Sequence, residues 1–340
     1  MSPSRRTLVT GAAALGALAH PLVGAAQAAR ISPAMQAVLD YVEGQKTTGF
    51  LIVQDRRTLV EKNWSPPADG PFRVMAYETT PEGALLEDIA SQQKSFVSML
   101  VAIAIDKGLI DVTQPVNAYI GAGWSKSSPE QEAKIRVIDV LTMSSGLTPG
   151  FAYAAPPGTR FYYNTPVYAV TKRILAAAAK QPLEVITRDW LTAPAGMSNT
   201  SWRKRPAMMA DVGNPTGLVT SPRDVARFGQ IVLDGGRAAD EKRIVSEQNL
   251  EAMFQRSATN PAYGRLWWLN GSDYAIRPFD NRINGPLIPA APADLVAALG
   301  ALDRKLYVVP SRKLVVVRMG QAAPDKGFDQ QLWLRLAKAL

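Results

Sequence analysis

The two ends of the sequence have the pattern of β-strands and the middle has the pattern of helices. This order limits the folds that the chain can adopt. Residues 48–54 and 58–64 form two β-rich runs joined by a short polar turn, and residues 304–309 and 313–319 form a second such pair. Hairpins at both ends are most economically paired in one antiparallel sheet. Apolar periodicity and chain breakers predict helices at 34–43, 91–107, 135–143, 166–179, 182–191, 222–234, 246–255 and 328–340.

We therefore expect an α+β fold, in which an antiparallel β-sheet is flanked by the terminal helices and carries an inserted all-helical lobe. The sheet part would take in about residues 31–90 and 256–340, and the helical lobe about residues 91–255, within one domain of residues 31–340. A cleft between the sheet and the lobe is a natural place for a binding site.

The first 28 residues have the pattern of a twin-arginine signal peptide. Arg5 and Arg6 precede a weakly apolar run, residues 8–23, and Ala26-Gln27-Ala28 supplies small residues for cleavage. The alternative is a disordered, alanine-rich tail. A signal of this type predicts a periplasmic or secreted protein. The longest other apolar run, residues 96–105, is too short to span a bilayer and suits a buried helix.

Two residue types that dominate hydrolase chemistry are missing from the expected mature chain. The sequence has no cysteine, and its single histidine, His20, lies inside the predicted signal. A Ser-His-Asp triad, a catalytic thiol and a zinc site built on Cys or His are therefore excluded after cleavage. Acid–base chemistry would fall to Lys, Tyr, Asp or Glu. We expect neither a metal nor an organic cofactor.

The net charge of +9 does not indicate a nucleic-acid partner. Apart from residues 203–205, the basic residues are scattered, and they do not alternate with aromatic residues in a stripe. We expect a small-molecule partner, and the sequence does not indicate an oligomeric state.

Ser91 and Lys94 form a Ser-x-x-Lys pattern at the start of a strongly apolar helix. The pattern alone is weak, because Ser201 and Lys204 repeat it. At Ser91, however, the two side chains share one helix face, and the apolar run that follows predicts burial of the lysine. Burial disfavours the ammonium, so Lys94 could act as a base near neutral pH. The alternative is a helix-capping serine with a surface lysine.

A tyrosine in the turn of residues 157–165 could share protons with Lys94. Both Tyr162 and Tyr163 stand there, immediately before the helix expected at 166–179. The alternative is that both rings pack in the core, which is the common fate of aromatic side chains.

Together these motifs resemble the serine β-lactamase-related hydrolases, a superfamily of class C β-lactamases, DD-peptidases, family VIII esterases and 6-aminohexanoate-dimer hydrolases. The resemblance covers about residues 45–320. The segments that carry it are Ser91-x-x-Lys94-Ser-Phe, Val140–Leu147, the Pro157-Gly158-x-x-Phe-x-Tyr turn, Thr216–Ser221, Tyr263–Trp268 and Leu306–Pro310.

The resemblance implies that Ser91 is acylated, that Lys94 is the general base and that Tyr163 is the partner acid/base. The family pattern at this turn is Tyr-x-Asn, whereas this chain has Tyr163-Asn164-Thr165 and, one residue earlier, a literal Tyr162-Tyr163-Asn164. We prefer Tyr163, with Asn164 in the substrate site, and leave Tyr162 as the alternative.

The third family motif, Lys-Thr-Gly or His-x-Gly, falls at residues 298–300 without its cationic residue. The resemblance implies that Gly300 lets the substrate approach, and the Ala301 N–H could complete an oxyanion hole with that of Ser91. The missing cation argues against an efficient β-lactamase. Arg304 or Lys305 could compensate, or both could be ordinary surface charges.

Tyr263 and Trp267 could line the acyl pocket, although core packing is an equal alternative. The segment of residues 270–293 is long and could cover the cleft. We expect a serine hydrolase that cleaves an ester or linear amide. The alternatives are a β-lactamase or DD-peptidase, and a non-catalytic envelope binding protein of the same fold.

Overall fold

The computed structural model describes residues 1, 31–66, 71–210 and 213–340. The expected signal peptide therefore lies outside the described residues, apart from Met1. The helices are α1 Pro33–Gly44, α2 Gln93–Asp106, α3 Asn117–Ile120, α4 Pro129–Glu132, α5 Val137–Leu141, α6 Thr165–Ala179, α7 Leu183–Thr187, α8 Ala207–Ala210, α9 Pro222–Leu233, α10 Glu247–Met253 and α11 Phe328–Ala339. The strands are β1 Thr47–Gln54, β2 Arg57–Asn63, β3 Ala76–Thr79, β4 Leu85–Asp88, β5 Ser201–Lys204, β6 Thr216–Thr220, β7 Trp268–Leu269, β8 Tyr274–Arg277, β9 Asn281–Asn284, β10 Val296–Gly300, β11 Arg304–Val309 and β12 Leu314–Gly320.

The large sheet joins the two ends of the chain, as the sequence predicts. Its order is β2-β1-β12-β11-β10-β7, and its neighbouring strands are antiparallel. The two end hairpins meet where β1 pairs with β12, with Leu51 opposite Val317. Strands β11 and β12 are buried along their whole length because helices cover both faces of the sheet, which explains their nearly continuous apolar sequence.

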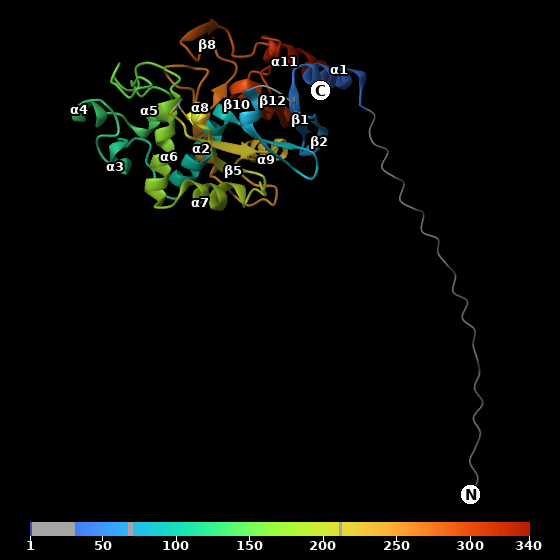
Figure 1. Ribbon diagram of the computed structural model, residues 1–340, viewed down its shortest axis with the longest axis horizontal. Coiled ribbons are helices and arrows are strands. Elements are labelled where there is room, and N and C mark those ends of the chain that lie inside the picture. Colours follow the sequence, from blue (N-terminus) through green and yellow to red (C-terminus); the bar gives the residue numbers. More distant parts are fainter. Residues whose placement is uncertain (2–30, 67–70, 211–212) are drawn as a thin grey trace.

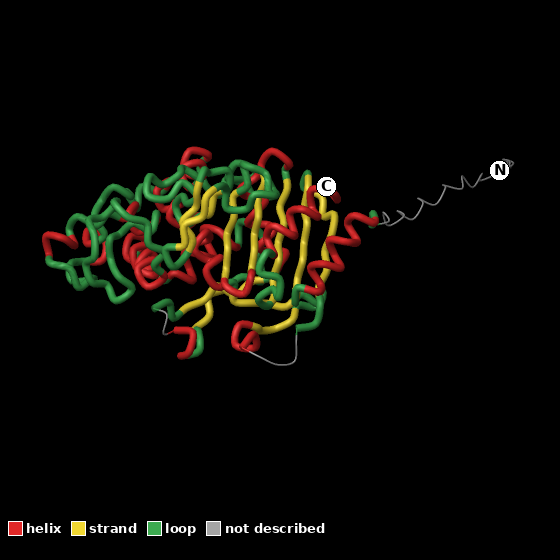
Figure 2. Tube along the Cα trace, turned by 90° about the horizontal axis from the view of Figure 1, so that it is seen from above, coloured by secondary structure: helices red, strands yellow, loops and turns green. Residues whose placement is uncertain are grey.

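Helices α1 and α11 pack together on one face of the large sheet, and α9 lies on the other (Figure 1). The helix-rich part of the molecule lies beyond the end of the sheet that is farther from β1 and β2 (Figure 2). This arrangement confirms the expected α+β class, with terminal helices on an antiparallel sheet and a helical insertion.

The middle of the chain also contributes two strands that the sequence analysis did not expect. Strands β5 and β6 pair with β3 and β4 in a second sheet of order β3-β4-β6-β5. Strand β4 ends at Asp88, three residues before Ser91, so this sheet supports the turn that carries the serine. In the segment of residues 270–293, β8 and β9 form a hairpin rather than an irregular loop.

Helix α2 is fixed on α9 by two stacked phenylalanines. Phe96 and Phe228 are fully buried, and their ring centroids are 3.8 Å apart with an interplanar angle of 15°. Because Phe96 lies in the first turn of α2, this contact holds the start of the helix in place.

Replacing Phe96 with Ala should therefore lower the free energy of unfolding by about 3–5 kcal/mol, because it removes a buried ring and leaves a cavity. Leu334→Ala on the exposed side of α11 is the control and should change it by less than about 0.5 kcal/mol. Urea unfolding of both variants checks this, and equal midpoints would contradict the packing described.

Candidate active site

Ser91 stands in a tight turn between β4 and α2. Ala90 has a left-handed backbone conformation, with φ of 49°, which costs an alanine about 1–2 kcal/mol. The residues Ala90–Gln92 form a 3-10 turn before α2 begins at Gln93, so the helix starts two residues later than predicted. The Asp88 Oδ1 atom accepts a hydrogen bond of 2.8 Å from the Ala90 N–H and so stabilises the strained turn.

A buried ion pair holds Asp88 in that position. Arg205 donates through Nε and Nη2 to the two Asp88 carboxylate oxygens, at 2.7 and 2.8 Å, and both side chains are almost fully buried. Gly217 leaves the space for this pair, because a Cβ there would lie 1.9 Å from Asp88 Oδ2. The pair positions Ser91 through the backbone and does not line the cleft.

Lys94 lies one helical turn after Ser91 and is 2% exposed. Its Nζ donates to Ser91 Oγ at 2.9 Å and to Thr165 Oγ1 at 3.2 Å. No carboxylate forms an ion pair with Lys94 among the described residues. Burial, and secondly the charge of Arg205, lower the pKa of Lys94 to about 7. The alternative of a surface lysine is therefore wrong, and the lowered pKa makes the neutral amine accessible near neutral pH.

Tyr163 lines the cleft together with Ser91. Its ring stacks on Trp268, with centroids 5.8 Å apart, and the Lys94 Nζ lies 4.9 Å from its centroid. Burial raises the pKa of Tyr163 to about 12, and a hydrogen-bonding interaction with Ser91 opposes this shift. Tyr162 instead lines a separate cavity of about 210 Å³, so the structure brings Tyr163 rather than Tyr162 beside the serine.

Asn164 does not line the cleft. Its Oδ1 accepts from the Val167 N–H at 3.2 Å and caps α6, and its Nδ2 donates to Leu147 O at 2.9 Å. Thr165 stands where the family pattern Tyr-x-Asn has its asparagine, and it is Thr165 that bonds Lys94. Sequence reasoning missed Thr165, although its place in the motif could have indicated it.

The tryptophan of the cleft is Trp268 and not Trp267. Trp267 is fully buried against Phe228 and Phe254. Tyr263 is also buried and packs against Trp268, with centroids 4.8 Å apart. Adjacent side chains near the start of β7 point to opposite faces, so only one of the two tryptophans can face the cleft. Tyr263 and Trp267 therefore support the wall of the cleft without lining it.

Gly300 and Ala301 do line the cleft. A Cβ on Gly300 would lie 2.4 Å from Ile89 O and 3.4 Å from the Gln92 Cβ, so only glycine lets β10 approach the turn that carries Ser91. This close approach brings the end of β10 beside the serine.

The cleft has a volume of about 400 Å³ and is mostly apolar. It is lined by Ser91, Tyr163, Trp268, Arg277, Pro278, Phe279, Leu287, Leu299, Gly300, Ala301 and Asp329.

Arg304 and Lys305 are not surface charges. Both are buried, Arg304 in an ion pair of 2.9 Å with Glu87 and Lys305 in pairs of 3.2 and 3.1 Å with Asp303 and Asp329. Because both cations already form ion pairs with carboxylates of the protein, neither replaces the cationic side chain that the family motif has at residue 298.

A second buried lysine, Lys172, lies behind Lys94. Its Nζ donates to Asn214 Oδ1 at 2.7 Å and to Thr216 O at 2.9 Å. Both lysine nitrogens lie near the Tyr168 ring, at 4.7 Å for Lys94 and 5.8 Å for Lys172. Burial, and then the charges of Arg205 and Lys94, lower the pKa of Lys172 to about 6.

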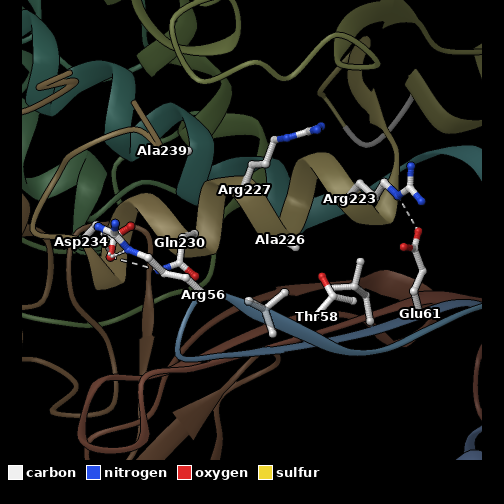
Figure 3. A pocket seen from close by; sticks show the side chains of 11 residues that line it. Arg56, Thr58, Glu61, Arg223, Ala226, Arg227, Gln230, Asp234 and Ala239 are labelled. Atoms are coloured by element: carbon white, nitrogen blue, oxygen red, sulfur yellow. Dashed lines mark hydrogen bonds and ion pairs between the residues drawn. The ribbon is translucent and has the colours of Figure 1, made fainter. Parts of the chain in front are cut away.

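Another cavity, of about 410 Å³, lies between the β1–β2 hairpin and α9 (Figure 3). Its three arginines are neutralised by nearby carboxylates, in the pairs Arg56–Asp234, Arg223–Glu61 and Arg227–Asp224. It contains none of the residues around Ser91, so it is separate from the candidate site.

Two other kinds of feature are not found in the part of the chain that the structure describes. Residues 31–66, 71–210 and 213–340 contain no group of three or more His, Asp or Glu side chains placed to hold a metal ion. None of the described helices has both the length and the apolar character needed to span a membrane.

This chain resembles known proteins in two ways: its sequence matches a family model, and its fold matches solved structures. A family model described as Beta-lactamase matches residues 36–340. No protein of curated function matches the chain by sequence.

Among solved structures, a β-lactamase from Mycobacterium bovis is 15% identical, with a TM-score of 0.65, and the match covers 89% of this chain and 99% of that one. A β-lactamase/D-alanine carboxypeptidase from Yersinia pestis is 17% identical, with a TM-score of 0.64 and coverage of 90% and 97%. A provisionally named 6-aminohexanoate-dimer hydrolase from Bacillus anthracis is 18% identical, with a TM-score of 0.64 and coverage of 88% and 81%. At these identities the likeness shows the fold alone.

Reaction of Ser91 with a fluorophosphonate should depend on pH through Lys94. The second-order labelling rate should rise from pH 5 to pH 9 with a midpoint near 7, because only the neutral amine accepts the serine proton. Lys94→Arg, which stays protonated, should slow labelling by about 10²- to 10⁴-fold. A rate that is flat with pH, or unchanged in Lys94→Arg, would contradict this role.

Asp88→Asn should lower the free energy of unfolding by about 3–5 kcal/mol, because it leaves the buried Arg205 charge without its carboxylate partner. Glu61→Gln, which breaks the more exposed Arg223 pair, is the matched control and should cost about 0–1 kcal/mol. Denaturant unfolding measures both changes. Equal losses would show that the buried pair does not stabilise the turn before Ser91.

Proposed function

The chain belongs to the beta-lactamase family, which supports serine-hydrolase chemistry, and we propose that it cleaves an ester or a linear amide through an acyl-enzyme on Ser91. The observation that carries this proposal is the 2.9 Å contact between Lys94 Nζ and Ser91 Oγ in a buried setting. A serine needs an adjacent base to become a nucleophile, and a neutral lysine can serve where no imidazole is present.

In the proposed reaction, Ser91 Oγ attacks the substrate carbonyl and its proton passes to Lys94 Nζ. The tetrahedral oxyanion forms between the backbone N–H groups of Ser91 and Ala301, beside the start of α2. As the intermediate collapses, the bond to the alcohol or amine breaks. The proton held by Lys94 reaches this leaving group through the phenol of Tyr163, and an acyl-Ser91 ester remains.

Water then attacks the acyl-Ser91 ester and gives a proton to the Lys94–Tyr163 pair. The second tetrahedral intermediate expels Ser91 Oγ, which takes the proton back, and the carboxylic acid leaves. The phenol suits a relay role because its raised pKa keeps the proton on Tyr163 in the resting site.

Three residues favour an ester or linear amide over a β-lactam. Ala298 is fully buried where the family motif has a cation, and Arg304 and Lys305 form ion pairs within the protein. A β-lactamase or DD-peptidase is the nearest alternative, because the Yersinia pestis protein with the same fold is named a β-lactamase/D-alanine carboxypeptidase. A non-catalytic binding protein is the alternative of a different class.

Export is proposed from the sequence alone. The pattern of residues 1–28 supports a twin-arginine signal and hence a periplasmic or secreted protein.

A fluorophosphonate probe tests the nucleophile. The folded protein should be labelled once, Ser91→Ala should abolish the label, and Ser201→Ala should keep it, because Ser201 lies in the second, exposed Ser-x-x-Lys copy. No label on folded wild-type protein would favour a binding protein.

The substrate class is tested with a 4-nitrophenyl ester panel, nitrocefin and a fluorescent penicillin. Ester turnover without nitrocefin turnover or penicillin labelling supports the proposal. Efficient nitrocefin turnover would overturn it in favour of a β-lactamase.

A further inference from the structure

Arg277 lies at the junction of two neighbouring cavities. It is the last residue of β8, and it lines the cleft that contains Ser91. It also lines a smaller cavity of about 230 Å³ that reaches toward the start of α11. The two cavities share Arg277, Leu287 and Asp329, so they adjoin at these side chains, and Ser91 lines the first of them.

Arg277 differs from Asp329, the other charged residue that both cavities share, because no ion pair is found for Arg277 in the described part of the chain. Asp329 pairs with Lys305 at 3.1 Å and also bonds the Tyr307 hydroxyl, so its charge is compensated. Arg277 donates from Nη2 to Leu287 O at 2.8 Å. A guanidinium has five N–H donors, and several therefore remain for a ligand.

The β8–β9 hairpin holds Arg277 in place. Arg277 pairs with Asn281 at the end of the hairpin, and Phe279 and Asp280 turn the chain in left-handed conformations, with φ of 65° and 54°. Asp280 forms an ion pair with Arg160, in the loop that leads to Tyr163. The turn is thus tied to the loop that leads to Tyr163, and the bond from Nη2 to Leu287 O holds the guanidinium itself.

The surfaces between Ser91 and Arg277 are mostly apolar. Trp268, Phe279, Leu287 and Leu299 supply them. A substrate that fits both groups has a reactive carbonyl, an apolar middle and an anionic end. The planar guanidinium matches a carboxylate with two parallel hydrogen bonds.

We propose that Arg277 binds a carboxylate at the end of the substrate remote from the scissile carbonyl, so that the preferred substrates are carboxylate-bearing esters or amides. This inference rests on the proposed function.

Two pairs of synthetic esters test the proposal. Mono-4-nitrophenyl adipate carries the carboxylate on the acyl side, and its methyl ester is the neutral partner. For a carboxylate on the leaving-group side, 4-acetoxybenzoate and its methyl ester form the second pair. The wild-type protein should prefer the charged member of at least one pair in kcat/KM, and Arg277→Gln should reduce that preference by about 10- to 100-fold, mainly through KM.

Arg282→Gln is the matched control, because it removes the same charge from the same hairpin. Arg282 is exposed, stacks on Tyr274 at 3.9 Å and does not line the cleft, so the preference should stay as in the wild type. The preference should also weaken in 0.5 M salt, which screens a charge–charge contact.

The inference is overturned if neither charged ester is preferred, or if Arg277→Gln lowers the rates for charged and neutral esters equally. The proposed function fails separately, if the wild-type protein hydrolyses none of the four esters faster than Ser91→Ala does.

Discussion

The site depends on a lysine that is buried beside a serine, with no carboxylate paired to it in the part of the chain that the structure describes. Solvation favours the ammonium in water, and the apolar surroundings of α2 remove most of that solvation from Lys94. The free-energy cost of burying Lys94 is limited because its ammonium can release a proton. The neutral amine then has the Ser91 and Thr165 hydroxyls as hydrogen-bond partners. Burial destabilises the ammonium and therefore makes Lys94 a base, and the positive charge of Arg205 lowers the pKa of Lys94 further. Much of the surrounding structure holds this arrangement in place, from the Asp88 carboxylate under the strained turn to the glycine at the end of β10.

The parts of the structure that local chemistry decides could be predicted from the sequence. Strand pairs at both ends of the chain had to meet, and they do so where β1 joins β12. Ser91 and Lys94 are three residues apart at the start of an apolar helix, so helical geometry alone puts their side chains together. The turn before Thr165 also brings a tyrosine to them, and counting along the family motif selected Tyr163 over Tyr162.

The parts that tertiary contacts decide could not be predicted in this way. Sequence spacing does not say which of two adjacent tryptophans faces a cleft, and Trp267 packs in the core while Trp268 lines the site. Asn164 is used as a helix cap, which a motif alone does not reveal. The charges of Arg304 and Lys305 looked like surface charges because their acidic partners are distant in sequence or belong to another element. Strands β5 and β6 were missed because they are short and lie between helices.

Direct titration of the lysine side chains by NMR tests the account most closely. In protein labelled with ¹³C at lysine Cε, Lys94→Arg and Lys172→Arg would assign the two resonances that shift at the lowest pH. The account predicts that the Lys94 signal titrates with a pKa of about 7, well below the ordinary lysine value of 10.5. A Lys94 signal that titrates near 10.5 would contradict the account, because the lysine would then be an ammonium at neutral pH and could not accept the proton of Ser91.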